Sequence, residues 1–389
     1  MTKIKMKESI EDKNSWFNVK RFSISGLKED FSKKTVDVNN ITKTLYENTT
    51  ELQKGEFIFQ KSKTIKNIES VKEIINQEDN TKIKNYFGWR GWLKDKFTIL
   101  TFTLDFNPFD SIKKIEDLSG FFQYYYSYSG KILFIPNIRR DKDIFSNGKK
   151  QGNREIINLD GYKKFVSQSF DFFSQKNNKP IFVPISLRFG IGKIEELIKF
   201  YLKNENFLFW IDFEGKAIDE AQTAKIREIN RVLKDEKRFD ETLIVFNNMK
   251  REIRSNIKED KSPASDVLGP LYGANIVGVD KEPARYFGPN FKPEEVIFEH
   301  KARKFDEKTY YYKKTTDNKF LTKHKNVTNN SIELGNEFLK QRKYFLKKQE
   351  IENYIKTKEM IIKYNKGRIL SDIKKNLLKQ GSLKKFLIN

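Results

Sequence analysis

The stretch FLFWIDFEG, residues 207–215, changes character at Asp212, where an apolar run of strand-forming residues becomes polar. Short runs that are apolar throughout are typical of strands buried on both faces, as in a parallel sheet covered by helices. Because successive side chains of a strand point to opposite faces, Asp212 and Glu214 share one face and Phe213 lies on the other. The stretch therefore predicts a buried strand that presents two carboxylates at its carboxyl end.

Similar apolar runs alternate with amphipathic segments on both sides of this stretch. Strands are expected at 97–106, 131–140, 179–189, 241–252 and 274–279, and helices at 161–175, 192–204, 217–236 and 262–273. This alternation indicates a parallel sheet with helices on both faces. No GxGxxG or GxxxxGK[ST] loop follows any expected strand, which argues against a nucleotide-binding doubly wound sheet. The sequence thus favours an α/β fold of the (β/α)8 TIM-like barrel type, with N-terminal strand additions and a basic helical C-terminal tail.

The sequence predicts four parts along the chain. Residues 1–95 are expected to hold N-terminal strands (15–28 and 55–65) and a helical segment (70–88) that pack on the barrel, after a frayed polar start at 1–15. The other expected parts are the main barrel at 96–290, a charged aromatic arm or hairpin at 291–330, and the basic helical tail at 331–389.

Composition bounds the class of protein. The chain has 389 residues, of which 37% are hydrophobic and 14% aromatic, enough for a large core. Lys and Arg number 76 against 53 Asp and Glu, a net charge of +23. Such an excess favours a polyanion as partner, because Lys and Arg release counterions from phosphates. The alternative is a lysine-rich composition set by an AT-rich genome.

Several kinds of chemistry are excluded. The absence of cysteine rules out disulfides, thiolate nucleophiles and Cys-ligated zinc. The only histidines, His300 and His324, lie in a charged region, which argues against a histidine metal site or a Ser-His-Asp triad. We therefore expect no metal and no cofactor. No apolar run reaches the roughly 18 residues of a membrane span, and the N-terminus lacks a signal-peptide core, so a cytoplasmic protein without membrane contact is expected.

Carboxylates at the strand ends are the catalytic candidates, because reactive groups of a barrel project from the carboxyl ends of its strands. The candidates are Asp212, Glu214 and Asp280, each as a general base or nucleophile on a substrate held by arginines. The same groups equally suit an inert ring of salt bridges.

Cations at or after the strand ends are the expected phosphate contacts. In GWRGWLK, residues 88–94, tryptophans alternate with cations as they do on surfaces that stack single strands, although these tryptophans equally suit a cap on the barrel. The expected nucleic-acid-binding residues are Arg139, Arg140, Arg188, Lys250, Arg251, Arg254, Arg285, Trp89, Arg90, Trp92, Lys374, Lys375 and Lys379.

The tail carries an amphipathic pattern. Ile369, Ile373 and Leu377 stand four apart, with lysines around them. Such a helix binds nucleic acid, or lies on the barrel or a partner with its lysines in water. We therefore expect nucleic acid as a partner, and protein partners or self-association through the C-terminal helices.

Two segments resemble the tRNA-guanine transglycosylase barrel family. They are FWIDFEGKAIDEAQTAKIREI (209–229) and SPASDVLGPLYGANIVGVDKEPAR (262–285). The resemblance implies base exchange in a nucleic acid through an Asp nucleophile. Gly278 stands where the family has this nucleophile, with Asp280 two residues later, and the cysteines of the family's structural zinc site are absent.

Three functions remain open from the sequence. The first is a nucleic-acid-binding barrel which, if it is catalytic, is a base-modifying enzyme of the transglycosylase kind that uses a strand-end carboxylate. The second is a non-catalytic RNA- or DNA-binding scaffold or subunit of a nucleoprotein complex. The third is a barrel enzyme that acts on a small phosphorylated metabolite.

Overall fold

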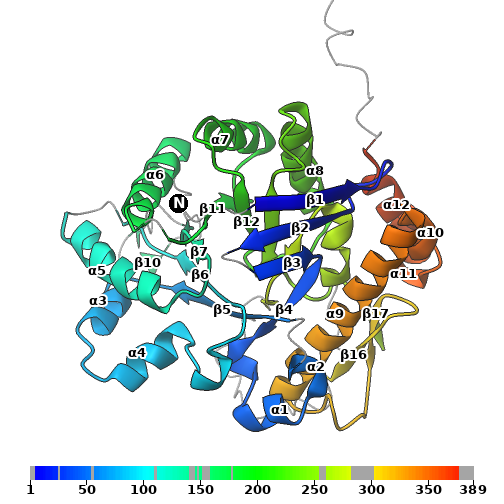
Figure 1. Ribbon diagram of the computed structural model, residues 1–389, viewed down its shortest axis with the longest axis horizontal. Coiled ribbons are helices and arrows are strands. Elements are labelled where there is room, and N and C mark those ends of the chain that lie inside the picture. The colour runs from blue at the N-terminus through cyan, green and yellow to red at the C-terminus, as the bar shows by residue number, and fades with distance from the viewer. Residues whose placement is uncertain are drawn as a thin grey trace, which may run out of the picture.

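The central element of the computed structural model is a parallel sheet that curls into a TIM-like barrel (Figure 1). The structure describes residues 5–24, 27–53, 57–108, 112–139, 145–146, 149–150, 158–176, 178–253, 260–281 and 302–375. The strands in spatial order are β7 (Leu133–Phe134), β11 (Ile181–Ser186), β12 (Leu208–Asp212), β13 (Leu243–Asn247), β15 (Ile276–Val277), β4 (Lys33–Asp37), β5 (Ile58–Ile65), β6 (Thr98–Leu104) and β8 (Asn137–Ile138). The fold class predicted from the sequence is confirmed.

One short segment pairs with both ends of this sheet. β7 pairs with β11, and β8, only a few residues later in the same segment, pairs with β6. The strand expected at 131–140 is therefore split in two, and its halves bring the ends of the sheet together. β4 and β5 also pair within the sheet, so residues N-terminal to 96 contribute barrel strands. The division of the chain into four parts stays a prediction.

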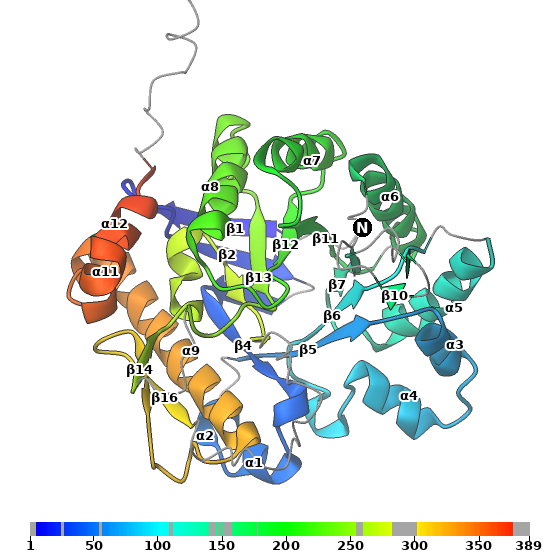
Figure 2. The ribbon, with the colours of Figure 1, turned by 180° about the vertical axis from the view of Figure 1, so that it is seen from behind.

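Helices cover the outside of the barrel. Between successive strands lie α1 (Lys43–Glu47), α2 (Thr50–Gln53), α3 (Glu69–Ile75), α4 (Asn80–Phe87), α5 (Ile112–Tyr128), α6 (Leu159–Ser174), α7 (Ile191–Lys203) and α8 (Glu220–Asp235). Their apolar faces pack on outward-facing strand residues: the ring of Tyr201 on α7, for example, lies 5.9 Å from that of Phe209 on β12 in this outer core. α9 (Lys323–Lys348) packs beside β4 and β16 (Figure 2), and its Gly335 leaves room for the ring of Phe57.

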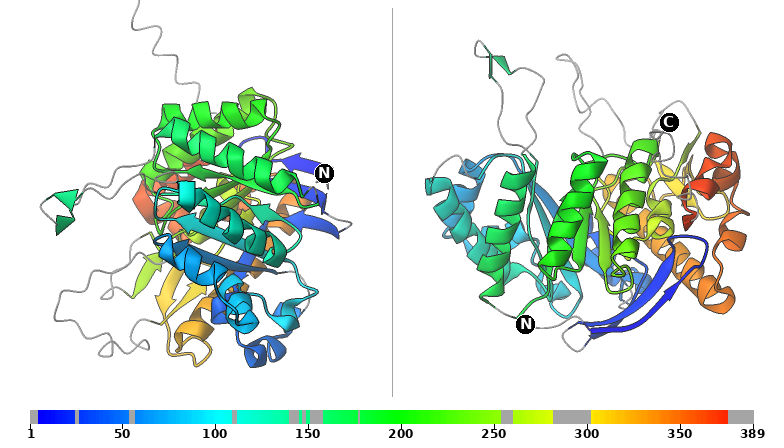
Figure 3. Two further views of the ribbon diagram at one scale, coloured as in Figure 1. Left: turned by 90° about the vertical axis from the view of Figure 1, so that its left-hand side faces the viewer. Right: turned by 90° about the horizontal axis from the view of Figure 1, so that it is seen from above.

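A three-stranded antiparallel sheet lies at the amino end of the barrel (Figure 3). Its strands are β1 (Lys5–Glu11), β2 (Asn18–Ile24) and β3 (Leu27–Phe31). Phe22 of this sheet is buried with inward-facing Trp210, Phe182 and Ile276 of the barrel in one apolar cluster. The expected frayed start is thus wrong for residues 5–11, because pairing with β2 orders them.

The region after β13 also differs from the expectation. In place of a helix over 262–273, β14 (Lys261–Pro263) pairs with β17 (Tyr311–Lys314), which in turn pairs with β16 (Arg303–Asp306). Two 3-10 turns follow, and Gly273 ends the second with φ 93°. The distant β16–β17 hairpin therefore overrides the helix-start signal of Ser262 and Pro263.

The C-terminal helices return to the N-terminal sheet. They are α10 (Glu352–Ile355), α11 (Glu359–Lys363) and α12 (Arg368–Asp372). The backbone N–H of Trp16 donates to the carbonyl of Ile373. Ile369 and Ile373 of the expected stripe are buried, and Leu377 lies outside the described residues.

Candidate active site at the barrel mouth

A buried polar layer fills the barrel beneath its carboxyl end. Gln60 of β5 donates to Thr101 (3.1 Å) and to the side-chain oxygen of Asn247 (2.7 Å), and it accepts from Thr35 (2.8 Å). A Cβ at Gly278 would lie 2.5 Å from the Asn247 side-chain oxygen and 2.9 Å from a backbone oxygen. The position at which the transglycosylase resemblance expects a nucleophile is therefore filled by neighbouring amides.

Asp212 lies above this layer with both oxygens occupied. Oδ2 accepts from Thr103 (2.6 Å) and Asn137 (3.2 Å), while Oδ1 accepts from the side chain of Asn248 (2.9 Å) and the backbone N–H of Glu214 (2.9 Å). Its side chain is buried. The hydroxyl of Tyr162, on α6, donates to the side-chain oxygen of Asn137 (2.8 Å) and extends the network. Asp212 therefore orders the mouth by accepting hydrogen bonds from β6, β8 and the segment after β13.

Glu214 is clamped between two arginines. Nε of Arg188 donates to both carboxylate oxygens, at 2.8 and 2.7 Å, and Nε of Arg139 lies 3.1 Å from Oε2. Glu214 has the left-handed φ of 54°, and Gly215 follows with φ 81°. This turn re-aims the Glu214 side chain after β12 ends. Two guanidiniums share one carboxylate, so the trio carries one net positive charge.

Lys281 is a further basic residue at the carboxyl end of the barrel. Its backbone N–H donates to the carbonyl of Met249, and its Nζ donates to the Thr64 hydroxyl at 2.8 Å. Burial lowers the pKa of Lys281, although the charge of Asp212 opposes the shift. In the part of the chain that the structure describes, no carboxylate lies within ion-pair distance of this amine. Lys281 is thus a half-buried amine without a counter-ion among the residues that the structure describes.

Asp280, next in the chain, faces the opposite way. Its Oδ1 lies 2.9 Å from Nζ of Lys34, whose side chain is fully buried. Nearby, Asp266 accepts from the Tyr312 hydroxyl (2.8 Å). Burial and the charge of Asp280 raise the pKa of Asp266 well above its usual range. Of the three candidate carboxylates, Asp212 and Glu214 therefore lie in one network and Asp280 in another.

The expected phosphate contacts are scattered. Arg251 pairs with Glu252 (2.9 Å), and its guanidinium lies over the ring of Tyr312. Lys374 pairs with Glu352 (3.2 Å) and Lys375 with Glu11 (2.8 Å). Lys250 is half-buried just beyond β13. Arg140, Arg254, Arg285 and Lys379 lie outside the described residues.

The tryptophan segment lies before β6, at the amino end of the barrel. Trp89 and Arg90 line a cavity of about 200 Å³, and Arg90 donates to the side chain of Asn85. The Trp92 ring packs 4.9 Å from that of Tyr46. These residues are therefore on the opposite side of the barrel from Asp212 and Glu214.

Sequence reasoning missed Thr64, Thr103 and Tyr162 as members of the mouth. The run TFTLDF, with threonines at every second position before Asp105, could have indicated that one face of this strand is polar. Tyr162 comes from a helix, and nothing in the local pattern indicates that its hydroxyl reaches Asn137.

No protein-family model matches the sequence. No curated protein matches it either. The solved structures it resembles include a GH26 beta-mannanase from Bacteroides ovatus, with 9% identity and a TM-score of 0.32 over 60% of this chain and 74% of that chain. A protein from Neocallimastix frontalis matches with 9% identity and a TM-score of 0.34, over 69% and 63% of the two chains.

These results correct the functional predictions. No protein-family model matches the sequence, and so no transglycosylase model does. The family resemblance is therefore wrong, and so is the nucleic-acid function with its alternatives. The geometry agrees, since Arg139 and Arg188 are held by Glu214 and the tail lysines by acidic partners.

Two searches of the described residues give negative results. None of the helices there is long and apolar enough to cross a membrane. Within the same ranges, no group of three His, Cys, Asp or Glu side chains is arranged to hold a metal ion.

Proposed function

We propose that the barrel is an enzyme that binds a small carboxylic acid with a neighbouring carbonyl group, and that the amine of Lys281 forms an imine with that carbonyl. The observation that carries the proposal is the placement of this amine at the barrel mouth, bonded to the neutral Thr64 hydroxyl. Imine formation requires an unprotonated lysine, and desolvation at such a site supplies it.

The electrostatics of the mouth support this role. Lysine in water has a pKa of about 10.4 and is almost entirely protonated at neutral pH. Burial lowers the pKa of Lys281, and the charge of Arg139 lowers it further. The charges of Asp212, Glu214 and Asp105 oppose this shift, but desolvation is the larger effect and the net direction is downward.

The arginine pair supports an acid as the substrate class. Arg139 and Arg188 hold Glu214 between them. Their side chains are 15% and 23% exposed, so both can reach a ligand while they hold Glu214. Guanidinium groups bind carboxylates in a fixed two-pronged geometry, which would orient the adjacent carbonyl.

The proposed step joins the amine of Lys281 to the carbonyl carbon of the substrate as an imine and releases water. The neutral amine of Lys281 attacks the carbonyl carbon, and a proton moves from nitrogen to the former carbonyl oxygen to give a carbinolamine. Loss of that hydroxyl as water, with a proton from solvent, leaves a protonated imine. Thr64 holds Nζ in place during attack. Glu214 holds the two guanidiniums beside the incoming acid.

Borohydride trapping tests the proposal. The protein is incubated with pyruvate, glyoxylate or 2-oxoglutarate, reduced with sodium borohydride and mapped by peptide mass spectrometry. An adduct on Lys281 with at least one acid is expected, and Lys281→Met should abolish it. Acetone is the control without a carboxylate and should react far less.

Lys179 is the matched control residue. Burial lowers the pKa of Lys179 to about 8. Lys179 stands just before β11, at the amino end of the barrel, and donates to the backbone carbonyls of Tyr126 and Ser129. Modification of Lys179 to the same extent as Lys281, or no adduct on either lysine, would overturn the proposed function.

A further inference from the structure

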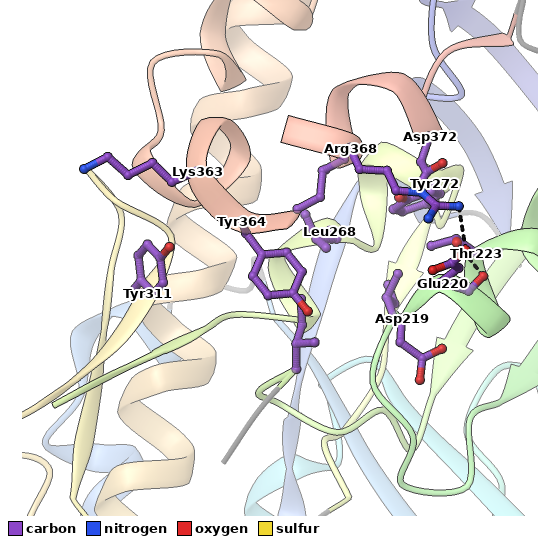
Figure 4. Close-up of a pocket in the computed structure, with 13 residues that line it drawn as sticks. Asp219, Glu220, Thr223, Leu268, Tyr272, Tyr311, Lys363, Tyr364, Arg368 and Asp372 are labelled. Carbon is purple, nitrogen blue, oxygen red and sulfur yellow. Dashed lines mark hydrogen bonds and ion pairs between the residues drawn. The ribbon is translucent and has the colours of Figure 1, made fainter. Parts of the chain in front are cut away.

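A cavity of about 520 Å³ lies outside the barrel, between the start of α8, the 3-10 turns before β15, and the C-terminal helices (Figure 4). Its size is that of pockets that enclose small organic ligands. Lys281 does not line it, and neither do the residues of the mouth network. The cavity is therefore separate from the site proposed above.

Three tyrosines line the cavity from three different elements. Tyr272 comes from the 3-10 turn, Tyr311 from β17 and Tyr364 from the end of α11 (Figure 4). In the part of the chain that the structure describes, none of their hydroxyls has a hydrogen-bond partner. Tyr272 is only 1% exposed, so its hydroxyl depends on the cavity for a partner. A ligand that forms a hydrogen bond with this hydroxyl would be stabilised by it.

Most of the charged side chains around the cavity form ion pairs. Arg368 pairs with Glu220 (2.7 Å) and lies 3.6 Å from Asp372, which also accepts from Arg227 (3.0 Å). Lys363 bonds to Glu359. Both cations of the lining are thereby paired, whereas the carboxylate of Asp219 forms no ion pair with a described side chain.

One carboxylate retains acceptor capacity. Oδ1 of Asp219 caps α8 by accepting from the backbone N–H of Gln222 (3.0 Å). Its Oδ2 has no partner among the described residues, and the exposed side chain lines the cavity to one side of Tyr364 (Figure 4). The site thus combines aromatic faces, hydroxyls that donate and accept, and a carboxylate that accepts.

We infer that this cavity binds a small neutral polyol, of the chemical class of a monosaccharide. Ring hydroxyls of such a ligand both donate and accept hydrogen bonds, so they match Asp219 and the tyrosine hydroxyls. Its apolar C–H face packs against the Tyr364 ring. An anion would be repelled by the carboxylate of Asp219, and a cation is the competing ligand class that the choline comparison tests.

Isothermal titration of the full chain tests the inference. The probes are D-glucose, D-galactose and D-mannose, with choline chloride and acetate as the ionic comparisons. At least one hexose should bind while neither ion does. Tyr272→Phe, which removes a single oxygen, should weaken binding about tenfold, and Tyr364→Ala should remove it.

Two controls make the result decisive. Tyr201→Phe deletes an equivalent buried hydroxyl that bonds to the carbonyl of Pro184 away from the cavity, and it should leave sugar binding unchanged. Lys281→Met should also leave it unchanged, so a failed imine test and a failed sugar test are separate outcomes. No hexose binding, tighter binding of either ion, or equal effects of Tyr272→Phe and Tyr201→Phe would each overturn the inference.

Discussion

Nζ of Lys34 lies 2.9 Å from Oδ1 of Asp280, across the pairing between the first barrel strand in the sequence, β4, and the last, β15. The same ammonium also donates to the carbonyl of Gly278. The ion pair therefore ties together two strands that are separated by most of the chain.

We expect Lys34→Met to lower the free energy of unfolding by about 3–5 kcal/mol, because it leaves the Asp280 carboxylate without its partner. Urea unfolding measures the change. Lys43→Met is the matched control: the Lys43–Glu47 pair is exposed, with 3.7 Å between the atoms, and its loss should cost at most about 0.5 kcal/mol. Equal effects of the two variants would contradict a role for the Lys34 pair in barrel stability.

Gly278→Ala should destabilise the protein by about 1–3 kcal/mol, since the added methyl group would meet the Asn247 side chain at 2.5 Å. Gly192→Ala offers the opposite case. Gly192 lies in α7 with no atom near its would-be Cβ, so alanine should stabilise by up to about 1 kcal/mol. Thermal unfolding of both variants checks the expected opposite signs.

Lys20 should make stability rise with pH. It is fully buried, and burial lowers its pKa to about 7, against 10.5 for an ordinary lysine. Between these values the unfolded chain binds a proton that the folded chain does not, so the free energy of unfolding increases from about pH 7 towards pH 10.5. Chemical unfolding at several pH values should show this slope in the wild type and a smaller slope in Lys20→Met. Identical slopes would exclude Lys20 as its source.

Asp266 should make the free energy of unfolding fall as the pH rises. Its pKa is raised by burial, so above its ordinary pKa of 3.8 the unfolded chain releases a proton that the folded chain retains. Its contribution to stability is full below that pH and is lost as the pH rises towards the folded value. Asp266→Asn, which resembles the protonated acid, should therefore be more stable than the wild type at pH 8 and lose this advantage near pH 4. A variant less stable at pH 8 would show that Asp266 is needed as an ion.

Tyr162→Phe should cost about 1–2 kcal/mol, because it removes the hydroxyl that bonds to Asn137 at 2.8 Å and to the carbonyl of Pro184 at 3.1 Å. It should also slow imine trapping at Lys281, since the Asn137–Asp212 network becomes looser. Comparison of the trapping rate with that of Tyr201→Phe separates an effect on the mouth network from a general loss of stability. A rate no lower than in Tyr201→Phe would remove Tyr162 from the mouth network.

The repeated strands and helices of the barrel were predictable because each carries its own period of apolar residues. The residues 207–215 show this well: Trp210 and Asp212 point inward, and Phe213 packs outside. Features that depend on partners distant in the sequence were not predicted. β14 forms only because β17 pairs with it, and Lys281 is unusual only because folding removes water and leaves it beside Thr64. Net charge misled for the same reason, since it does not reveal that Arg139 and Arg188 share Glu214.

The apolar cluster that joins Phe22 to the inward face of the barrel affects how molecules enter and leave the site. With the N-terminal sheet packed against that end, the barrel resembles a cup rather than a tube. Any molecule that reacts at Lys281 must leave by the opening through which it came. Release of product and arrival of the next substrate would then compete for one passage, so a tightly held product would act as its own inhibitor.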